Sequence, residues 1–362
     1  MNRYLFRGNW RRLLTGAAIV CSALPALPAT AGYVETVLVT SAADPDLINP
    51  WGISHSGGSP FWVSDNGTGR ATLYNSAGTK QGLIVTMPFG SAPITGQVFN
   101  GTATFNGDLF IFGSENGTIA GWRGALGTTA EQLYAVPGAV YKGLGISTAA
   151  NTLFAANFSN GTVDLFDSTH STPIGSFSDP TAPAGYAPFN VQNIGGRIYV
   201  TFAVQDPARH DDVAALGNGL VDIFDPVTHT FTRLISNGQL DSPWGLALAP
   251  GTFGEFAGDL LVGNFGNGDI NAFNPSTGAF LGTLQDAANN PIVNPGLWGL
   301  IFGNGGNGGS PDALYFTAGG ADEDIGVFGR ITPLSSVPEP SSFALLAIGL
   351  AGLITSYLRK LS

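Results

Sequence analysis

Six short segments of the chain place an aromatic or hydrogen-bonding side chain at a corresponding position, and these side chains could form a binding site. The segments are PWGIS, FNGTA, YKGLG, FNVQN, PWGLA and LWGLI, and the residues are Trp51, Asn100, Lys142, Asn190, Trp244 and Trp298. Tryptophan faces and amide groups suit a neutral polar ligand such as a sugar, by stacking and directed hydrogen bonds. Packing of the tryptophans inside the fold is the other interpretation, and both stay open.

Other chemistry is sparse, so we assign no catalytic residue and no definite metal ligand. His55, His170, His210 and His229 are scattered, and the chain has neither a Gly-x-Ser-x-Gly elbow nor a phosphate-binding loop. Two acidic segments, 206–212 and 322–324, offer oxygen ligands that would suit Ca²⁺ or another divalent metal. Neither has the full spacing of a calcium loop, and solvated turns are the alternative interpretation.

The six segments open the units of an internal repeat between residues 48 and 333. Five units carry Gly, four residues and an aromatic, ending at Tyr74, Trp122, Phe166, Phe224 and Phe273, and the sixth ends at Phe328. An apolar run and a turn, often Asn-Gly, precede each aromatic segment, which is typical of a β-hairpin. With the opening segment and a fourth run, each unit has four strands, the pattern of a propeller blade. The sequence therefore predicts an all-β, six-bladed β-propeller whose opening strands line a central channel.

The sixth unit has no fourth run of its own. The segment YVETVLVTS, which begins at Tyr33, is an unassigned strand at the other end of the repeat region. We expect this N-terminal strand to complete the last blade and close the ring, which would leave no long free edge.

The N-terminal 31 residues resemble a secretory signal peptide. Arg3, Arg7, Arg11 and Arg12 precede an apolar stretch that ends in the cleavage pattern Ala29-Thr30-Ala31. We therefore expect a signal at 1–31, the propeller at 32–334 and a separate tail at 335–362. Cleavage after Ala31 would remove the only cysteine, so the mature protein would have no disulfide and no thiolate metal site.

The tail combines a proline motif, an apolar run and a basic end. Pro338-Glu339-Pro340 precedes a 343–358 stretch without charge, which we expect to be a hydrophobic transmembrane helix, and Arg359 and Lys360 follow it. This order resembles the PEP-CTERM sorting signal of Gram-negative bacteria. The resemblance implies export through the Sec translocon, a transient inner-membrane anchor, processing by an exosortase, and delivery to the cell surface or extracellular matrix.

The repeat itself resembles NHL-type propellers, and together with the tail it looks like a PEP-CTERM-associated family of propeller proteins. The lactonase branch of similar propellers binds a divalent metal in the channel through one Glu, two Asn and one Asp. Asn100 or Asn190 could match an Asn of that set, but the first opening segment, NPWGIS, has no Glu.

The charge balance narrows the choice of partner. Removal of the signal changes 14 basic and 25 acidic residues to 10 and 25, a net charge of −15. Such a surface repels nucleic acid and anionic lipid headgroups. We expect a monomeric surface protein that acts as a binding or interaction module, with extracellular polysaccharide as the candidate partner. A secreted, metal-dependent lactonase-like hydrolase and a structural matrix protein are the alternatives.

Overall fold

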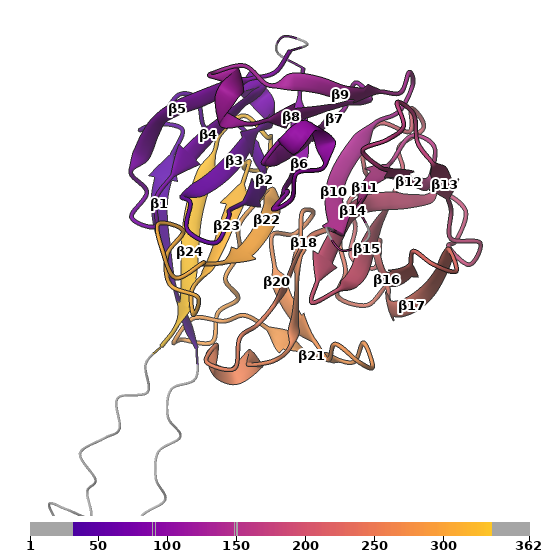
Figure 1. The fold of residues 1–362 in the computed structure, drawn as a ribbon. Coiled ribbons are helices and arrows are strands. Elements are labelled where there is room, and N and C mark those ends of the chain that lie inside the picture. The colour runs from indigo at the N-terminus through magenta and orange to yellow at the C-terminus, as the bar shows by residue number, and fades with distance from the viewer. Residues whose placement is uncertain (1–31, 89, 91, 148, 150, 335–362) are drawn as a thin grey trace, which may run out of the picture.

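Six four-stranded antiparallel sheets are arranged in a ring around a central axis, as Figure 1 shows. The computed structural model describes residues 32–334 except residues 89, 91, 148 and 150. Five sheets use consecutive strands, and the sixth has the order β1-β24-β23-β22. The predicted all-β, six-bladed propeller with four-stranded blades is therefore confirmed.

Each blade runs from an inner strand at the axis to an outer strand at the perimeter. Blades one to three comprise β2 (Pro50–Ser54), β3 (Phe61–Asp65), β4 (Arg70–Tyr74) and β5 (Lys80–Thr86); β6 (Ile94–Phe99), β7 (Phe110–Ser114), β8 (Thr118–Trp122) and β9 (Glu131–Ala135); and β10 (Tyr141–Ser147), β11 (Thr152–Asn157), β12 (Thr162–Phe166) and β13 (Gly175–Phe177). Blades four to six comprise β14 (Tyr186–Ile194), β15 (Arg197–Val204), β16 (Leu220–Asp225) and β17 (Thr230–Ser236); β18 (Pro243–Leu248), β19 (Leu260–Asn264), β20 (Ile270–Phe273) and β21 (Phe280–Thr283); and β22 (Leu297–Phe302), β23 (Leu314–Ala318), β24 (Val327–Pro333) and β1 (Tyr33–Thr40).

The only helices among the described residues are short 3₁₀ turns in the connections. They are η1 (Asn66–Thr68), η2 (Phe105–Gly107), η3 (Gly124–Leu126) and η4 (Gly254–Phe256). No helix in this part of the chain has the length and hydropathy needed to cross a membrane. The helix expected at 343–358 lies outside the described residues.

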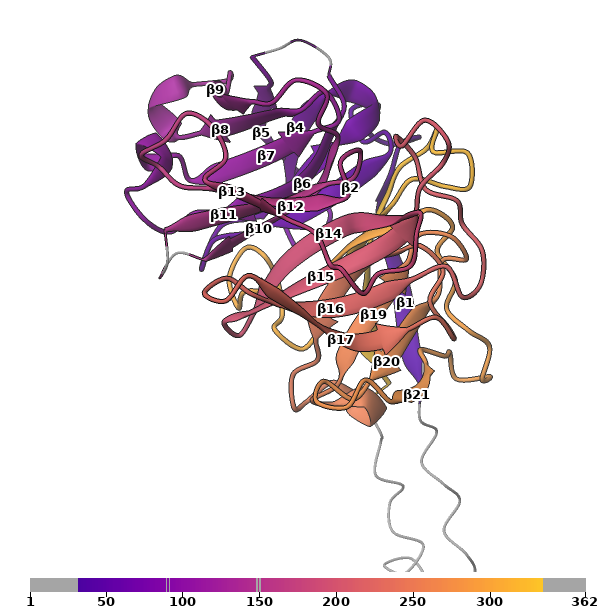
Figure 2. The ribbon, with the colours of Figure 1, turned by 90° about the vertical axis from the view of Figure 1, so that its right-hand side faces the viewer.

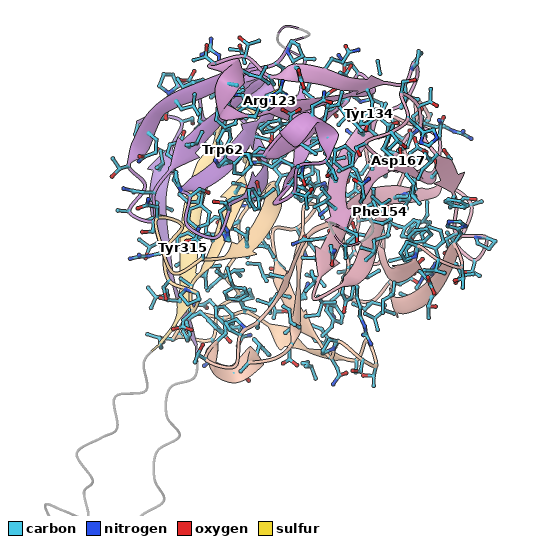
Figure 3. All side chains as sticks on the ribbon, viewed as in Figure 1. Trp62, Arg123, Tyr134, Phe154, Asp167 and Tyr315 are labelled. Atoms are coloured by element: carbon cyan, nitrogen blue, oxygen red, sulfur yellow. The ribbon has the colours of Figure 1, made fainter. Side chains whose placement is uncertain are left out.

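Packing between neighbouring blades explains why the second and third strands are apolar on both faces. A buried hydrophobic cluster fills each of the six blade interfaces, and a seventh occupies the centre of the ring. Between blades one and two, for example, Trp62, which is labelled in Figure 3, stacks on Phe110 with 4.1 Å between ring centroids. Because both faces of a strand are covered, its sequence reads as a continuous apolar run, without the alternation of a half-exposed strand.

The N-terminal strand closes the ring as expected. β1 pairs antiparallel with β24, from Tyr33 opposite Pro333 to Thr40 opposite Val327. Figure 2 shows the same strand lying among the last blades of the ring. The hydroxyl of Tyr33 also donates a hydrogen bond to the carbonyl oxygen of Phe253 in blade five, at 3.1 Å. The two ends of the repeat region are thus joined by a complete strand pairing.

Candidate functional site

The inner strand of every blade is bulged at the same level of the channel. In all six blades the register between the inner strand and its neighbour shifts at this level. A bulge re-aims the side chains of the bulged strand and is common beside functional sites. The residues at this level are Trp51, Thr95, Lys142, Phe189, Trp244 and Trp298.

Two positions of the sequence-predicted set need correction. The inner strand of blade two is β6, so the predicted opening segment FNGTA lies beyond its end, and Thr95 takes the place assigned to Asn100. Asn100 is buried in the following turn, where its amide donates to the carbonyl oxygens of Thr104 and Asp108, both at 2.9 Å. The segment was misassigned because both FNG and ITG match the residue-Gly pattern of an opening strand.

In blade four, the residue equivalent to the tryptophans of the other blades is Phe189, one position before the predicted Asn190. Asn190 stands where the other inner strands carry glycine, so that Phe189 occupies the level of the tryptophans. The Asn190 amide nitrogen donates to the carbonyl oxygen of Trp244 at 2.8 Å, and its oxygen accepts from the Val191 N–H at 2.8 Å. Asn190 therefore ties blade four to blade five.

The three tryptophans form a central aromatic cluster together with Phe158, Phe189 and Phe265. Trp51 and Trp298 stack with 3.6 Å between ring centroids, and Trp244 meets both edge-on at 6.3 and 5.8 Å. Their exposed fractions are 3%, 1% and 4%. Burial of this extent is expected of packing residues, and their role as ligand platforms stays a prediction.

Lys142 is another of the predicted site residues. It lies next to this cluster and is almost completely buried. Its ammonium group forms ion pairs with Glu115 and with Asp211, the latter at 3.2 Å. It also lies 5.0 Å from the centre of the Trp51 ring, within the range of a cation–π contact. Burial of an ammonium is tolerated when carboxylates and an aromatic face replace its water shell.

A chain of hydrogen bonds extends from Lys142 around the axis. Glu115 accepts a hydrogen bond from the Asn66 amide at 3.2 Å, and the Asn66 oxygen accepts from Asn49 at 3.4 Å. The Asn49 amide also donates to Glu323 at 2.6 Å, and its oxygen accepts the indole N–H of Trp298 at 2.9 Å. Side chains from blades one, two, three and six are therefore linked at this end of the channel.

Blades four and five complete the set with Asp212 and Ser242. The Ser242 hydroxyl and the Asp212 Oδ2 atom are both buried, and the hydroxyl lies close enough to the Asp212 carboxyl to donate a hydrogen bond to it. Burial raises the pKa of Asp212 to about 6, and the nearby Ser242 hydroxyl and Lys142 ammonium oppose the rise. Burial also raises the pKa of Glu323, against the hydrogen bond from Asn49.

We call this set the axial polar ring. Its members come from all six blades and comprise Asn49, Asn66, Glu115, Lys142, Asp211, Asp212, Ser242 and Glu323. Four carboxylates surround one ammonium, so the ring carries an excess of negative charge and of hydrogen-bond acceptors. Asp211 is 68% exposed, which makes the ring accessible from solvent.

The connections between second and third strands position most of the ring. These connections all lie at one end of the propeller, because the strands of each blade alternate in direction. Glu115 stands in the Asn-Gly hairpin of blade two, and the longer connections of blades four and six carry the acidic segments 206–212 and 322–324. The two acidic segments, interpreted from the sequence as solvated turns or calcium ligands, thus converge on Lys142.

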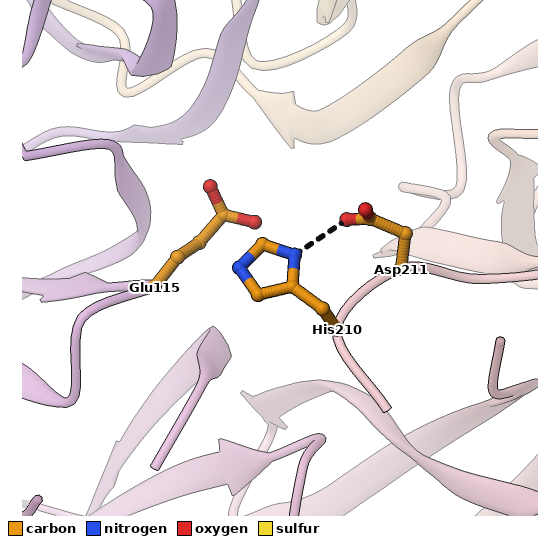
Figure 4. Close-up of side chains that lie close together, drawn as sticks. All are labelled: Glu115, His210 and Asp211. Atoms are coloured by element: carbon orange, nitrogen blue, oxygen red, sulfur yellow. Dashed lines mark hydrogen bonds and ion pairs between the residues drawn. The ribbon is translucent and has the colours of Figure 1, made fainter. Parts of the chain in front are cut away.

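The ring does not fit the metal set of lactonase-like propellers. Glu115, His210 and Asp211 have ligand atoms within 4.8 Å of one another (Figure 4). However, Lys142 already pairs with Glu115 and Asp211, and His210 Nδ1 lies 2.9 Å from Asp211. The oxygens of Asn49 and Asn66 accept hydrogen bonds within the ring. The Lys142 ammonium therefore already pairs with two of the three groups that could hold a metal.

A comparison with family models identifies a sorting motif in the tail of the chain. Residues 336–360 match the PEP-CTERM protein-sorting motif. This motif implies export, processing by an exosortase and sorting to the bacterial cell surface. The protein is thus a six-bladed β-propeller that carries a surface-sorting motif in its tail.

Two relatives in Acanthamoeba polyphaga mimivirus define the family. The uncharacterized protein R648 is 33% identical over 279 residues, which cover 71% of this chain and 69% of the relative. The uncharacterized protein L690 is 32% identical over 288 residues, which cover 73% and 75%. The chain belongs to the same family as these two proteins.

Solved structures support the fold alone. Virginiamycin B lyase from Staphylococcus aureus aligns with a TM-score of 0.51 at 15% identity, covering 83% of this chain and 99% of the lyase. A luciferin-regenerating enzyme aligns with a TM-score of 0.52 at 15% identity, covering 84% and 96%. The specific resemblance to NHL propellers stays a prediction.

Proposed function

We propose that this protein is a cell-surface binding module whose axial polar ring binds a hydroxyl-rich saccharide segment of an extracellular polysaccharide. The carrying observation is the excess of acceptors over donors in the ring, of which the Asp211 carboxylate is open to solvent. Sugar hydroxyls supply donors for such oxygens. The surface sorting implied by the PEP-CTERM motif would place the ring where polysaccharide is met.

The charge of the ring indicates which polysaccharides suit it. Glu115, Asp211, Asp212 and Glu323 outnumber Lys142, and the whole mature chain is strongly acidic. Like charges at close range disfavour binding. Neutral and amino-sugar polymers are therefore preferred over polymers of uronic acids.

Calorimetric titration with three oligosaccharide sets tests this proposal: neutral, amino-sugar and uronic-acid oligomers. Neutral or amino-sugar oligomers should bind, and Asp211→Asn should weaken binding about tenfold. Glu255→Gln is the matched control, because Glu255 is an exposed acid outside the ring in η4. Absence of binding by all three sets, or equal effects of the two substitutions, would contradict the proposal.

Metal-dependent hydrolysis is the second candidate, favoured by the closeness of Glu115, His210 and Asp211. The fit of the site is poor, since Lys142 pairs with two of these groups. Lactone hydrolysis that depends on added divalent metal and is abolished by a chelator would favour this candidate. If the protein neither binds the saccharides nor hydrolyses the lactones, a role as a structural matrix protein would be favoured.

A further inference from the structure

The chain has ten Asn-Gly dipeptides, and the structure leaves one of them unprotected against loss of the asparagine amide. The asparagines are Asn66, Asn100, Asn106, Asn116, Asn160, Asn218, Asn237, Asn267, Asn304 and Asn307. An asparagine before glycine is chemically labile, because glycine has no Cβ atom to hinder attack of its backbone nitrogen on the asparagine Cγ. Whether attack occurs depends on how the fold holds the two residues.

Seven of the dipeptides are protected by a hydrogen bond from the glycine N–H, which fixes the nitrogen that would attack. The acceptor is a backbone carbonyl oxygen in six cases and the Asn304 Oδ1 atom in the seventh, at 2.8 to 3.2 Å. The donors are Gly67, Gly107, Gly117, Gly161, Gly268, Gly305 and Gly308. The hydrogen bonds that form these turns therefore also protect the asparagine amides.

Two of the other three dipeptides are protected by burial. Asn100 is fully buried, and its amide nitrogen donates to the carbonyl oxygens of Thr104 and Asp108. Gly219, which follows Asn218, is buried as well, and a Cβ atom there would lie 2.5 Å from the Cβ atom of Leu240. Neither site has room for the rotation that brings the glycine nitrogen to the side chain.

Asn237 and Gly238 have neither protection. Both residues are exposed, in the connection between β17 and β18. The Gly238 N–H has no acceptor in the part of the chain that the structure describes, and a Cβ atom at Gly238 would meet only the Ser236 carbonyl oxygen, at 3.9 Å. The Asn237 side chain is held by one hydrogen bond, from its amide nitrogen to the carbonyl oxygen of Gly217 at 2.7 Å. Opening of this single bond frees the Asn237 Cγ atom.

We propose that Asn237 is a site of spontaneous deamidation, with water as the co-reactant. The Gly238 nitrogen attacks Asn237 Cγ and forms an N–Cγ bond, and the Asn237 Nδ2 group leaves as ammonia with the proton that the Gly238 nitrogen loses. Water then opens the cyclic imide at one of its two carbonyl carbons, which gives aspartate or isoaspartate. The net reaction consumes one water and releases one ammonia, with no change of oxidation state.

The reaction alters a contact between blades four and five. The Asn237 amide and the Asn237 N–H donate to the carbonyl oxygens of Gly217 and Gly219, at 2.7 and 2.9 Å. A carboxylate has no hydrogen to donate to Gly217, and it repels the carbonyl oxygen. Isoaspartate also lengthens the backbone between residues 237 and 238 by one carbon. Deamidation therefore loosens the connection that leads to Ser242.

Peptide mass spectrometry of the purified protein, after incubation at mildly alkaline pH, tests the site. Asn237 should convert at least tenfold faster than any of the other nine asparagines, and fragmentation distinguishes aspartate from isoaspartate. In denaturant all ten should convert at similar rates, because the fold no longer protects them. Conversion of a protected dipeptide as fast as Asn237 in the folded protein would overturn the proposal. So would an unchanged Asn237 under conditions in which the denatured chain converts.

Two substitutions test the mechanism and its consequence. Gly238→Ala adds a Cβ atom beside the attacking nitrogen and should slow conversion of Asn237 at least tenfold; an unchanged rate would overturn the mechanism. Asn237→Asp reproduces one product and should lower the melting temperature. Asn160→Asp is the matched control, because Asn160 is also exposed before a glycine and its side chain makes no hydrogen bond within the described propeller. Equal melting temperatures of the two aspartate variants would overturn the loosening of the connection.

Discussion

Trp51 and Trp298 stack face to face across the junction between the first and last blades, with 3.6 Å between ring centroids and 20° between ring planes. The pairing of β1 with β24 joins the same ends of the repeat region at the perimeter. The propeller is therefore closed twice, by a backbone ladder outside and by an aromatic stack at the axis. Both closures can be tested separately.

Replacement of either stacked tryptophan should destabilise the propeller strongly. Because both rings are buried, we expect Trp51→Ala and Trp298→Ala to lower the free energy of unfolding by about 3–5 kcal/mol each. Trp122→Ala, at the interface of blades one and two, should have a similar cost. Unfolding of the three variants in urea measures these losses in free energy. If the stability losses are small for Trp51→Ala and Trp298→Ala but large for Trp122→Ala, the first two rings would instead be available to bind a ligand.

Removal of the closing strand should destabilise the last blade. A variant without residues 33–40 leaves the backbone groups of β24 unpaired and exposes a free edge. We expect a loss of several kcal/mol, with self-association through the edge. Chemical unfolding and size-exclusion chromatography report on the two effects, with Val37→Ala as a control at an exposed position of β1. A monomeric deletion variant of unchanged stability would show that the pairing contributes little.

The sequence predicted the blades well because the turn chemistry and the apolar runs are local. The fourth runs expected in the first two units correspond to β5 and β9, for example. The inner position of blade two was missed because two neighbouring segments share the residue-Gly pattern. In the structure, the register of β6 with β7 and the close approach of Gly96 to Leu144 identify the inner segment.

The axial polar ring was largely beyond sequence reasoning. Asn49 and Glu323 are 274 residues apart and meet only because the ring closes. Lys142 was identified from its place in an opening strand, and the acidic segments from their charge, but their convergence depends on the circular arrangement. Glu115 offered one usable signal: it is an acid in an Asn-Gly hairpin on the same edge as the two acidic connections.

The stability of the propeller should depend on pH through Asp212. Burial raises the pKa of this carboxyl from 3.8 to about 6, so the folded protein binds more protons than the unfolded chain between these values. The stabilisation from this group is complete below pH 3.8 and is lost as the pH rises through about 6. Asp212→Asn should therefore gain stability relative to the native protein between pH 4 and pH 8, by about 1–3 kcal/mol. Chemical unfolding of the native protein and of Asp212→Asn at pH 4 and pH 8 measures this gain in stability. An equal gain at the two pH values would contradict the predicted dependence on Asp212.

The sorting tail should be dispensable for folding. All six blades are complete at Pro333, the last residue of β24, and Leu334 donates its N–H to Gly32 at 2.9 Å. A variant that ends at Leu334 should be soluble and should melt at the same temperature as the full chain in detergent. Calorimetry of both forms tests this, and a substantially lower melting temperature for the shorter form would mean that residues 337–358 stabilise the propeller.

Lys142 should act as the built-in counter-cation of the axial polar ring. Lys142→Met keeps the volume of the side chain but leaves Glu115 and Asp211 without their positive partner. Glu115, whose side chain is 10% exposed, would then be an unpaired and largely buried charge, so we expect a loss of about 3–5 kcal/mol in stability, with little contribution from the exposed Asp211. Millimolar Ca²⁺ should restore part of this loss, since the carboxylates can then hold a cation in place of the ammonium.

A double variant separates charge from packing in this test. Lys142→Met with Glu115→Gln removes the ion pair from both sides, so it should be more stable than Lys142→Met alone and less responsive to Ca²⁺. The native protein should show no stabilisation by Ca²⁺, because its ammonium occupies the position. Thermal unfolding of the three proteins with and without Ca²⁺ measures these effects. Strong stabilisation of the native protein would instead identify the ring as a metal site and would move the proposed function toward the metal-dependent hydrolase.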